Sequence, residues 1–188
     1  MGVKKSLLVI DLPYNTYRNK SEALKNSKKA IKETNCDAVK VEGGTRVKEI
    51  VKHLVKNRIP VLGHIGITPQ TTKGKFTSKG KNEIEKRKLL KDAKDLEQSG
   101  AFGIVLECIY SDISKKITNL VSIPTIGIGA SVNCDGQVLV TDDLIGLNET
   151  KFRFVKKFGN IKKNIISAVI KYKNSVKQKK FPSKKNSY

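Results

Sequence analysis

The sequence predicts an α/β fold in which a parallel β-sheet forms a (β/α) barrel of the TIM type. Short apolar runs alternate with segments of helical periodicity, and most connections between them are short. Such alternation indicates parallel strands, in either a barrel or an open sheet. Charged residues stand at the ends of several strands, and in a barrel the chemistry lies at that rim. No G-x-G-x-x-G motif or P-loop follows the first apolar run, so a barrel is favoured.

Strands are expected where apolar residues run without polar alternation. The run Leu7-Leu8-Val9-Ile10 suits a strand buried on both faces, as in parallel sheets. Strands are predicted over residues 6–13, 37–44, 59–66, 102–108 and 123–129, and a further apolar segment runs from 135 to 145.

Helices are expected where apolar residues recur every three or four positions. The first has Ser21 as its predicted N-cap. The polar, lysine-rich segment 71–82 is typical of a long loop that covers a site or binds anions. Helices are predicted over about 21–34, 45–57, 83–99, 112–120 and 152–172, so a catalytic domain is expected over 1–172 and a basic polar tail over 173–188.

The most informative stretch runs from Asp37 to Gly44. Residues two apart in a strand point to the same face, so Lys40 and Glu42 are expected to project together, opposite Val39 and Val41. An ion pair beside a Gly-Gly turn is more than a core strand needs. A solvated edge strand with two outward charges is the alternative.

Composition limits the classes of function. The net charge of +21 would favour nucleic acid or an anionic membrane surface. However, the lysines are spread over nearly every segment and few aromatic residues interleave with them, which favours anionic small molecules as ligands. Cys36, Cys108 and Cys134 are widely spaced and form no C-x-x-C motif, which fits a reducing cytoplasm. We find no secretory signal and no apolar stretch of roughly 20 residues, so a soluble cytoplasmic protein is expected.

Six motifs occur in order along the chain. They are Leu-Leu-Val-Ile-Asp-Leu-Pro at 7–13, Val-Lys-Val-Glu-Gly-Gly at 39–44, Gly-His-Ile-Gly-Ile-Thr-Pro-Gln at 63–70, Val-Leu-Glu-Cys at 105–108, Pro-Thr-Ile-Gly-Ile-Gly-Ala at 124–130 and Asp-Gly-Gln-Val-Leu-Val at 135–140. In this order and spacing they closely resemble the ketopantoate hydroxymethyltransferases.

The resemblance implies a barrel of the phosphoenolpyruvate/pyruvate kind and an enzyme of pantothenate biosynthesis. Members transfer a one-carbon unit from 5,10-methylenetetrahydrofolate to 3-methyl-2-oxobutanoate and form 2-dehydropantoate. They use Mg²⁺ or a similar divalent cation and assemble into homo-oligomers, commonly decamers. They also carry an earlier segment with the first two strands and an Asp-Ser metal and substrate motif. The barrel is therefore expected to be incomplete here, and the activity of this chain alone to be severely reduced.

The resemblance also assigns roles to individual residues. Asp11 is expected to bind both metal and substrate, Glu42 to serve the metal, and Lys40 to bind the substrate and offset oxyanion charge. Glu107 matches the proton acceptor that would form a metal-stabilised enolate, and its apolar neighbours in sequence are expected to raise a carboxyl pKa. His64 is expected at the rim near metal or substrate, or else as a buried structural histidine.

Each of these residues also has a purely structural interpretation. Asp11 would then cap a turn, Lys40 and Glu42 would form a structural pair, and Glu107 would face a helix N-terminus. For the whole chain, the alternatives are a truncated non-catalytic relative, another metal-dependent 2-oxo acid lyase on the same barrel, or a basic protein that binds nucleic acid.

Overall fold

The computed structural model describes residues 3–72, 74, 77–149 and 152–188. The chain divides into two compact units, Met1–Val138 and Leu139–Tyr188, and each is described here by itself. The predicted loop at 71–82 includes positions 73, 75 and 76, which lie outside the described residues. The predicted division at residue 172 stays a prediction.

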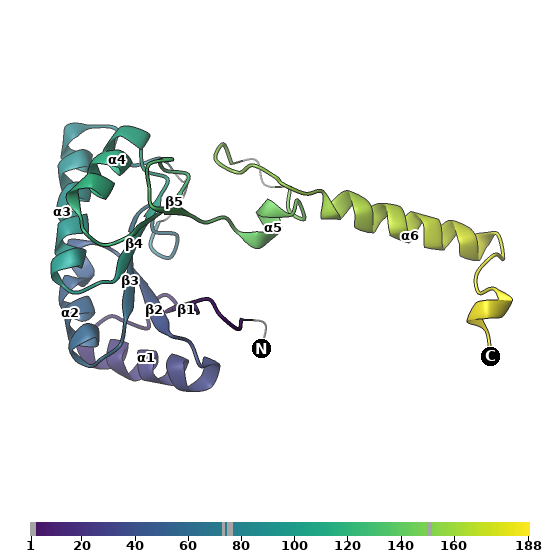
Figure 1. Ribbon diagram of the computed structural model, residues 1–188, viewed down its shortest axis with the longest axis horizontal. Helices are drawn as coiled ribbons and strands as arrows, with labels where there is room; N and C mark the ends of the chain where they lie inside the picture. The colour runs from purple at the N-terminus through teal and green to yellow at the C-terminus, as the bar shows by residue number, and fades with distance from the viewer. Residues whose placement is uncertain (1–2, 73, 75–76, 150–151) are drawn as a thin grey trace. The chain divides into compact units, whose positions relative to one another are not determined.

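The first unit is built on one sheet of six parallel strands in the order β1-β2-β3-β4-β5-β6, which confirms the predicted parallel α/β architecture. Each strand pairs with the strands next to it in sequence, and from β1 to β5 a helix crosses back between successive strands (Figure 1). The strands are β1 Val9–Asp11, β2 Ala38–Glu42, β3 Val61–Gly66, β4 Gly103–Glu107, β5 Thr125–Ile128 and β6 Gly136–Gln137.

The first strand differs from its prediction. It was expected to be buried on both faces, but Leu7 is 70% exposed, Val9 and Ile10 are half-buried and Asp11 is exposed. The physical reason is its place in the sheet, since β1 ends the strand order and pairs only with β2 among the described strands.

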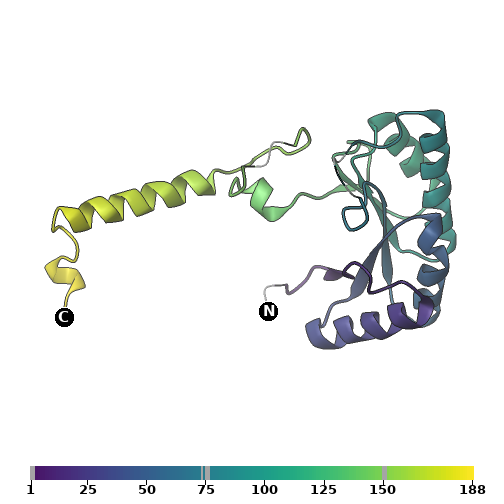
Figure 2. The same cartoon turned by 180° about the vertical axis from the view of Figure 1, so that it is seen from behind.

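The helices of this unit are α1 Lys20–Thr34, α2 Lys48–Lys56, α3 Glu83–Gln98 and α4 Ser111–Leu120, and a short 3₁₀ turn, η1, spans Thr45–Val47. They lie along one face of the sheet, as the two opposite views show (Figures 1 and 2). The predicted N-cap of the first helix is wrong by two residues. Asn19 caps it, because the Asn19 side chain accepts a hydrogen bond from Glu22 N.

The core lies between the sheet and these helices. Val39 and Val41 of β2 are fully buried there, whereas Lys40 and Glu42 project from the opposite face and approach each other within 4.0 Å. This confirms the alternation that was predicted for the strand. The alternative of a solvated edge strand is wrong, because β2 pairs on both sides and Glu42 is buried.

The register of the strands brings their polar ends together. Asp11 lies beside Lys40 in the first pairing, Glu42 beside His64 in the second, and Gly66 beside Glu107 in the third. Because all strands are parallel, these residues meet at the carboxyl edge of the sheet.

The second unit holds α5 Thr141–Leu144, α6 Ile161–Lys177 and a 3₁₀ turn, η2, over Lys184–Asn186. The helix predicted over 152–172 therefore begins and ends later. Asn160 sets its start, because its side chain accepts a hydrogen bond from Lys163 N. No residue of α6 is buried. None of the helices in the described part of the chain is long and apolar enough to cross a bilayer.

Candidate active site

Five charged or titratable side chains from four strands form one connected cluster. It consists of Asp11, Lys40, Glu42, His64 and Glu107, and these are all the site residues that the sequence predicted. Each stands at the middle or toward the carboxyl end of its strand, on the face away from the helices. The structure therefore brings the whole predicted set together.

Lys40 is the centre of this cluster. Its Nζ lies 3.0 Å from Asp11 Oδ2, 3.1 Å from His64 Nδ1 and 4.0 Å from Glu42 Oε1. An ammonium group has three donors and no acceptor, so it donates to His64 Nδ1 and forms a close ion pair with Asp11, whereas Glu42 lies beyond hydrogen-bond distance. The Lys40 side chain is 13% exposed, and it is held by its partners rather than spread over the surface.

The contacts of His64 define its tautomer. Nδ1 faces the Lys40 ammonium, which can only donate, so Nδ1 accepts. Nε2 lies 2.8 Å from the carbonyl oxygen of Ile67, which can only accept, so Nε2 carries the hydrogen. A neutral imidazole with its proton on Nε2 satisfies both contacts. The same Nε2 lies 3.2 Å from Glu107 Oε2, so the ring joins the lysine to the carboxylate.

Glu107 ends β4, and its side chain is 18% exposed. The next residue, Cys108, has a φ of 51°, a left-handed backbone conformation that costs a non-glycine residue of order 1 kcal/mol. Burial, and secondarily the Glu107 carboxylate, raise the pKa of the Cys108 thiol to about 11. The thiol is therefore protonated at neutral pH and does not act as a nucleophile there.

The sequence matches known proteins over its whole length. The protein-family model of ketopantoate hydroxymethyltransferase matches residues 1–184. The chain belongs to the ketopantoate hydroxymethyltransferase family. Its relatives are named as transferases, so this is an enzyme family.

Two relatives show how far the similarity extends. A 3-methyl-2-oxobutanoate hydroxymethyltransferase of Pelagibacter ubique is 58% identical over 188 residues, which are 100% of this chain and 73% of that protein. An enzyme of the same name from Aliarcobacter butzleri is 45% identical over 190 residues, and this chain covers 71% of it. Among solved structures, a dihydrodipicolinate synthase from Acinetobacter baumannii superposes with a TM-score of 0.49 at 15% identity, over 74% of this chain and 57% of that one.

In this member of the family, the structure adds two residues that the prediction missed. Gln70 donates its backbone N–H to Glu42 Oε2 at 3.0 Å and its side-chain amide to the carbonyl oxygen of Leu12 at 2.8 Å. Tyr17 donates its hydroxyl to Gln70 Oε1 at 2.7 Å and accepts from Glu42 N. Burial raises the pKa of the Tyr17 phenol. The one available signal was that Gln70 ends the longest matched motif.

The donor set of the cluster fits a hard divalent cation only in part. Asp11 is 57% exposed and has Lys40 as its one ion-pair partner among the described residues, and Glu42 Oε1 contacts Lys40 only loosely. In the described part of the chain, no three His, Cys, Asp or Glu side chains group closely enough to hold a metal. Two carboxylates nevertheless fit Mg²⁺, which often takes only one or two from a protein and completes its shell with water and substrate oxygens.

Proposed function

We propose that this chain is a 3-methyl-2-oxobutanoate hydroxymethyltransferase that uses 5,10-methylenetetrahydrofolate as its one-carbon donor and forms 2-dehydropantoate for pantothenate biosynthesis. The observation that carries the proposal is the connected cluster from Asp11 through Lys40 and His64 to Glu107. It combines a carboxylate base with a cation at the carboxyl edge of the sheet, and removal of a proton from a carbon next to a carbonyl group requires both.

The cluster supports a division of roles in the first half of the reaction. Glu107 takes the proton from C3 of the 2-oxo acid, and the electron pair of the C–H bond moves toward the carbonyl oxygen. The Lys40 ammonium offsets the negative charge that develops on that oxygen, as a fixed cation does best where water is excluded. His64 accepts from Lys40 and donates to the carbonyl oxygen of Ile67, and its Nε2 lies 3.2 Å from Glu107 Oε2, so the fixed ring lies between the cation and the base.

The second half of the reaction forms a carbon–carbon bond. Both carbon–nitrogen bonds of the donor's methylene carbon break with their electron pairs on nitrogen: the oxygen of water replaces one nitrogen and C3 of the enolate replaces the other. One proton of that water and the proton taken from C3 end on the two nitrogens. Asp11 and Glu42 would hold Mg²⁺, and Asp11 would also contact the substrate. A bound Mg²⁺ would supply Lewis-acid polarisation of the 2-oxo acid.

We extend the proposal to the fold, the assembly and the compartment. The helices of the first unit cover one face of the sheet and leave the polar face to the cluster (Figure 1). A doubly wound sheet would carry helices on both faces, so this arrangement supports a (β/α) barrel of the phosphoenolpyruvate/pyruvate kind instead. A homo-oligomer, decameric as in the family, is the proposed assembly. Cys36, Cys108 and Cys134 are free thiols, in keeping with the reducing cytoplasm that we propose as its compartment.

The decisive experiment measures proton exchange without the donor. The chain is incubated in D₂O with 3-methyl-2-oxobutanoate and Mg²⁺, and deuterium at C3 is followed by NMR. We expect exchange that Glu107→Gln slows by about 100-fold or more, because the general base is gone. Glu33→Gln is the matched control, since Glu33 is exposed on α1 and takes no part in the cluster. Exchange that is absent, or equal in the Glu107 variant, would refute the proposed mechanism.

Turnover is then measured with the donor added. Formation of 2-dehydropantoate that needs both substrates supports the complete reaction. Exchange without product formation would leave an enolising enzyme and would exclude the proposed transfer.

A further inference from the structure

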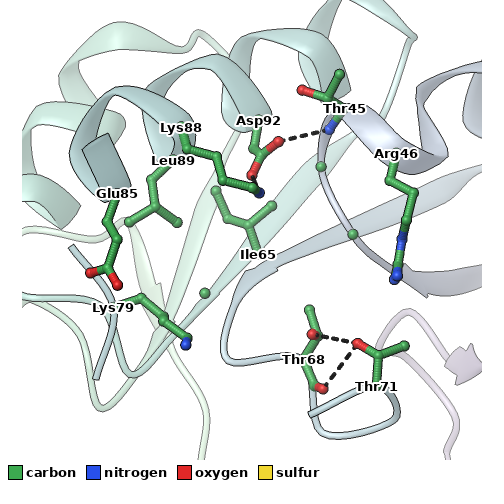
Figure 3. A pocket seen from close by; sticks show the side chains of 13 residues that line it. Thr45, Arg46, Ile65, Thr68, Thr71, Lys79, Glu85, Lys88, Leu89 and Asp92 are labelled. Atoms are coloured by element: carbon green, nitrogen blue, oxygen red, sulfur yellow. Dashed lines mark hydrogen bonds and ion pairs between the residues drawn. The ribbon is translucent and has the colours of Figure 1, made fainter. Parts of the chain in front are cut away.

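A pocket lies in the first unit, outside the charged cluster. It has a volume of about 660 Å³, within the range of small-molecule sites. The segment that follows β2, the end of β3 with the loop after it, and α3 form its walls (Figure 3). None of the five cluster residues lines it.

The acidic side chains of this pocket already have hydrogen-bond or ion-pair partners within the protein. Asp92 accepts from Thr45 N at 2.8 Å and pairs with Lys88. Glu85 accepts from the backbone N–H groups of Gly80 and Lys81 at 2.9 and 3.0 Å. Both carboxylates are therefore neutralised or hydrogen-bonded by the walls, and they repel an incoming anion less than free carboxylates would.

Two cationic side chains of the same pocket are available to a ligand. Arg46 and Lys79 form no side-chain hydrogen bond or ion pair with any residue in the described ranges. Figure 3 shows them on opposite sides of the pocket, Arg46 after β2 and Lys79 before α3. An anion that enters the pocket therefore meets positive charge from both sides.

The remaining walls supply hydroxyl groups and an apolar surface. Thr68 and Thr71 share one hydrogen bond of 2.7 Å between their hydroxyl groups, on the side toward Arg46 (Figure 3). Ile65 and Leu89 form an apolar wall. A ligand that satisfies all of these groups has an apolar or aromatic body and more than one anionic group.

We propose that this pocket binds an aryl dicarboxylate through Arg46 and Lys79, with its aromatic body against Ile65 and Leu89. The inference rests on the proposed function in one respect: the one-carbon donor contains such a group, p-aminobenzoylglutamate, and the pocket would hold that part of it. Guanidinium and ammonium groups form charge-assisted hydrogen bonds with carboxylates, about twice as strong as neutral ones.

An adjoining pocket indicates how the bound ligand would be oriented. It has a volume of about 280 Å³ and shares Arg46 and Thr71 with the larger one. Tyr17 lines it, and the Tyr17 hydroxyl accepts from the backbone N–H of Glu42. A long molecule anchored by its carboxylates in the larger pocket can thus extend past Arg46 toward the strand that carries Lys40 and Glu42.

The test is binding of p-aminobenzoyl-L-glutamate to the full chain, measured by calorimetry. We expect Arg46→Gln and Lys79→Gln each to weaken binding by about tenfold, because each removes a charge-assisted contact. Arg87→Gln and Lys115→Gln are the matched controls, exposed residues outside both pockets, and should bind like the unaltered chain. No binding by the unaltered chain, or equal binding by all four variants, would overturn the proposal.

Inorganic phosphate, as a second probe, distinguishes a dicarboxylate pocket from a general anion site. Phosphate that binds as tightly as p-aminobenzoyl-L-glutamate, with the same sensitivity to Arg46 and Lys79, would overturn the proposal. Weak binding of phosphate that does not compete with p-aminobenzoyl-L-glutamate supports the proposal.

Kinetics with the complete donor separate this inference from the proposed function. If the chain turns over, both pocket variants should raise the KM for the donor and leave kcat and the KM for the keto acid nearly unchanged. A donor KM that does not change, or a rise in the keto acid KM instead, contradicts the pocket assignment while the activity stands. If the chain does not turn over, the calorimetry still decides the pocket.

Discussion

Glu97 illustrates how a single carboxylate joins two elements. It lies on α3, and its Oε1 accepts from Ser122 N at 2.5 Å and from Ser122 Oγ at 2.7 Å, just before β5. The backbone N–H of Ser122, followed by the Lys94 ammonium and the Ser122 hydroxyl, lowers the pKa of this carboxyl group to about 2. The folded state thus favours the ionised form.

This low pKa predicts a pH-dependent contribution to stability. A carboxyl group with a lowered folded pKa stabilises the fold above its ordinary pKa of about 4.5, and the contribution is lost as the pH falls toward about 2. After a discount for solvent screening, Glu97→Gln should lower the free energy of unfolding by about 1–2 kcal/mol near pH 7. Urea unfolding should show a smaller difference near pH 2.5. An equal difference at both values would contradict the assigned cause.

At the scale of residues, the sequence predicted which side chains form the candidate site but not how they touch. Lys40 and Glu42 could be placed on one face because strand periodicity is local. The tautomer of His64 depends on the carbonyl of Ile67, and the position of Glu42 depends on Gln70. These contacts arise from the loop after β3, whose path no periodicity defines.

At the scale of elements, the junction between β2 and α3 depends on one glycine. A Cβ atom at Gly44 would lie 2.1 Å from Cβ and Cγ of Asp92, so only glycine allows this approach. The approach lets Asp92 accept from Thr45 N at the start of the 3₁₀ turn η1. Gly44 therefore lets the chain after β2 pack directly against α3.

We predict that Gly44→Ala destabilises the first unit by about 2 kcal/mol, because α3 must shift or Asp92 must lose its contact with Thr45. Gly136→Ala is the matched control, since a Cβ there meets only Ile126 at 3.8 Å, an ordinary contact. It should change stability by less than about 0.5 kcal/mol. Thermal and urea unfolding compare the two, and equal effects would show that Gly44 is not constrained.

The ends of elements were predicted less well than their existence. The first and last long helices begin at asparagine caps, Asn19 and Asn160, rather than at the predicted residues. Both caps were visible in the sequence, and Gly159 directly before Asn160 also marks a boundary. Apolar periodicity continues past helix ends into turns, so by itself it cannot locate them.

For the whole molecule, the dominant feature is the excess of positive charge. The chain has 38 lysine and arginine residues against 17 acidic ones. Many acidic side chains are already paired, as in Lys20 with Glu49 and Lys91 with Asp95, so the unpaired charge is mostly positive. Mutual repulsion of that charge opposes the compact state.

Salt should therefore stabilise this protein. Raising NaCl from about 10 mM to about 300 mM screens the repulsion more than it weakens the exposed ion pairs. We expect the Tm to rise by about 2–4 °C, equivalent to about 1 kcal/mol for a chain of this size. Circular dichroism melts in NaCl and KF separate screening from ion-specific effects. A fall in Tm would mean that ion pairs outweigh the net charge.

The parallel sheet could be predicted from the sequence because short connections leave few topologies open. Connection length alone could not predict that the helices cover the same face of the sheet from its first strand to its last. That depends on which face of each strand is apolar, and β5 with its half-buried Ile126 and Ile128 shows little contrast between its faces.

Gln70 gives the site an all-or-none character. One residue binds the carbonyl of Leu12, the hydroxyl of Tyr17 and the carboxylate of Glu42, which belong to three separate stretches of chain. A movement of Gln70 that breaks one of these hydrogen bonds would strain the other two. Amide hydrogen exchange at Gln70 should therefore follow one cooperative opening that frees the end of β1 and releases Glu42 at the same moment.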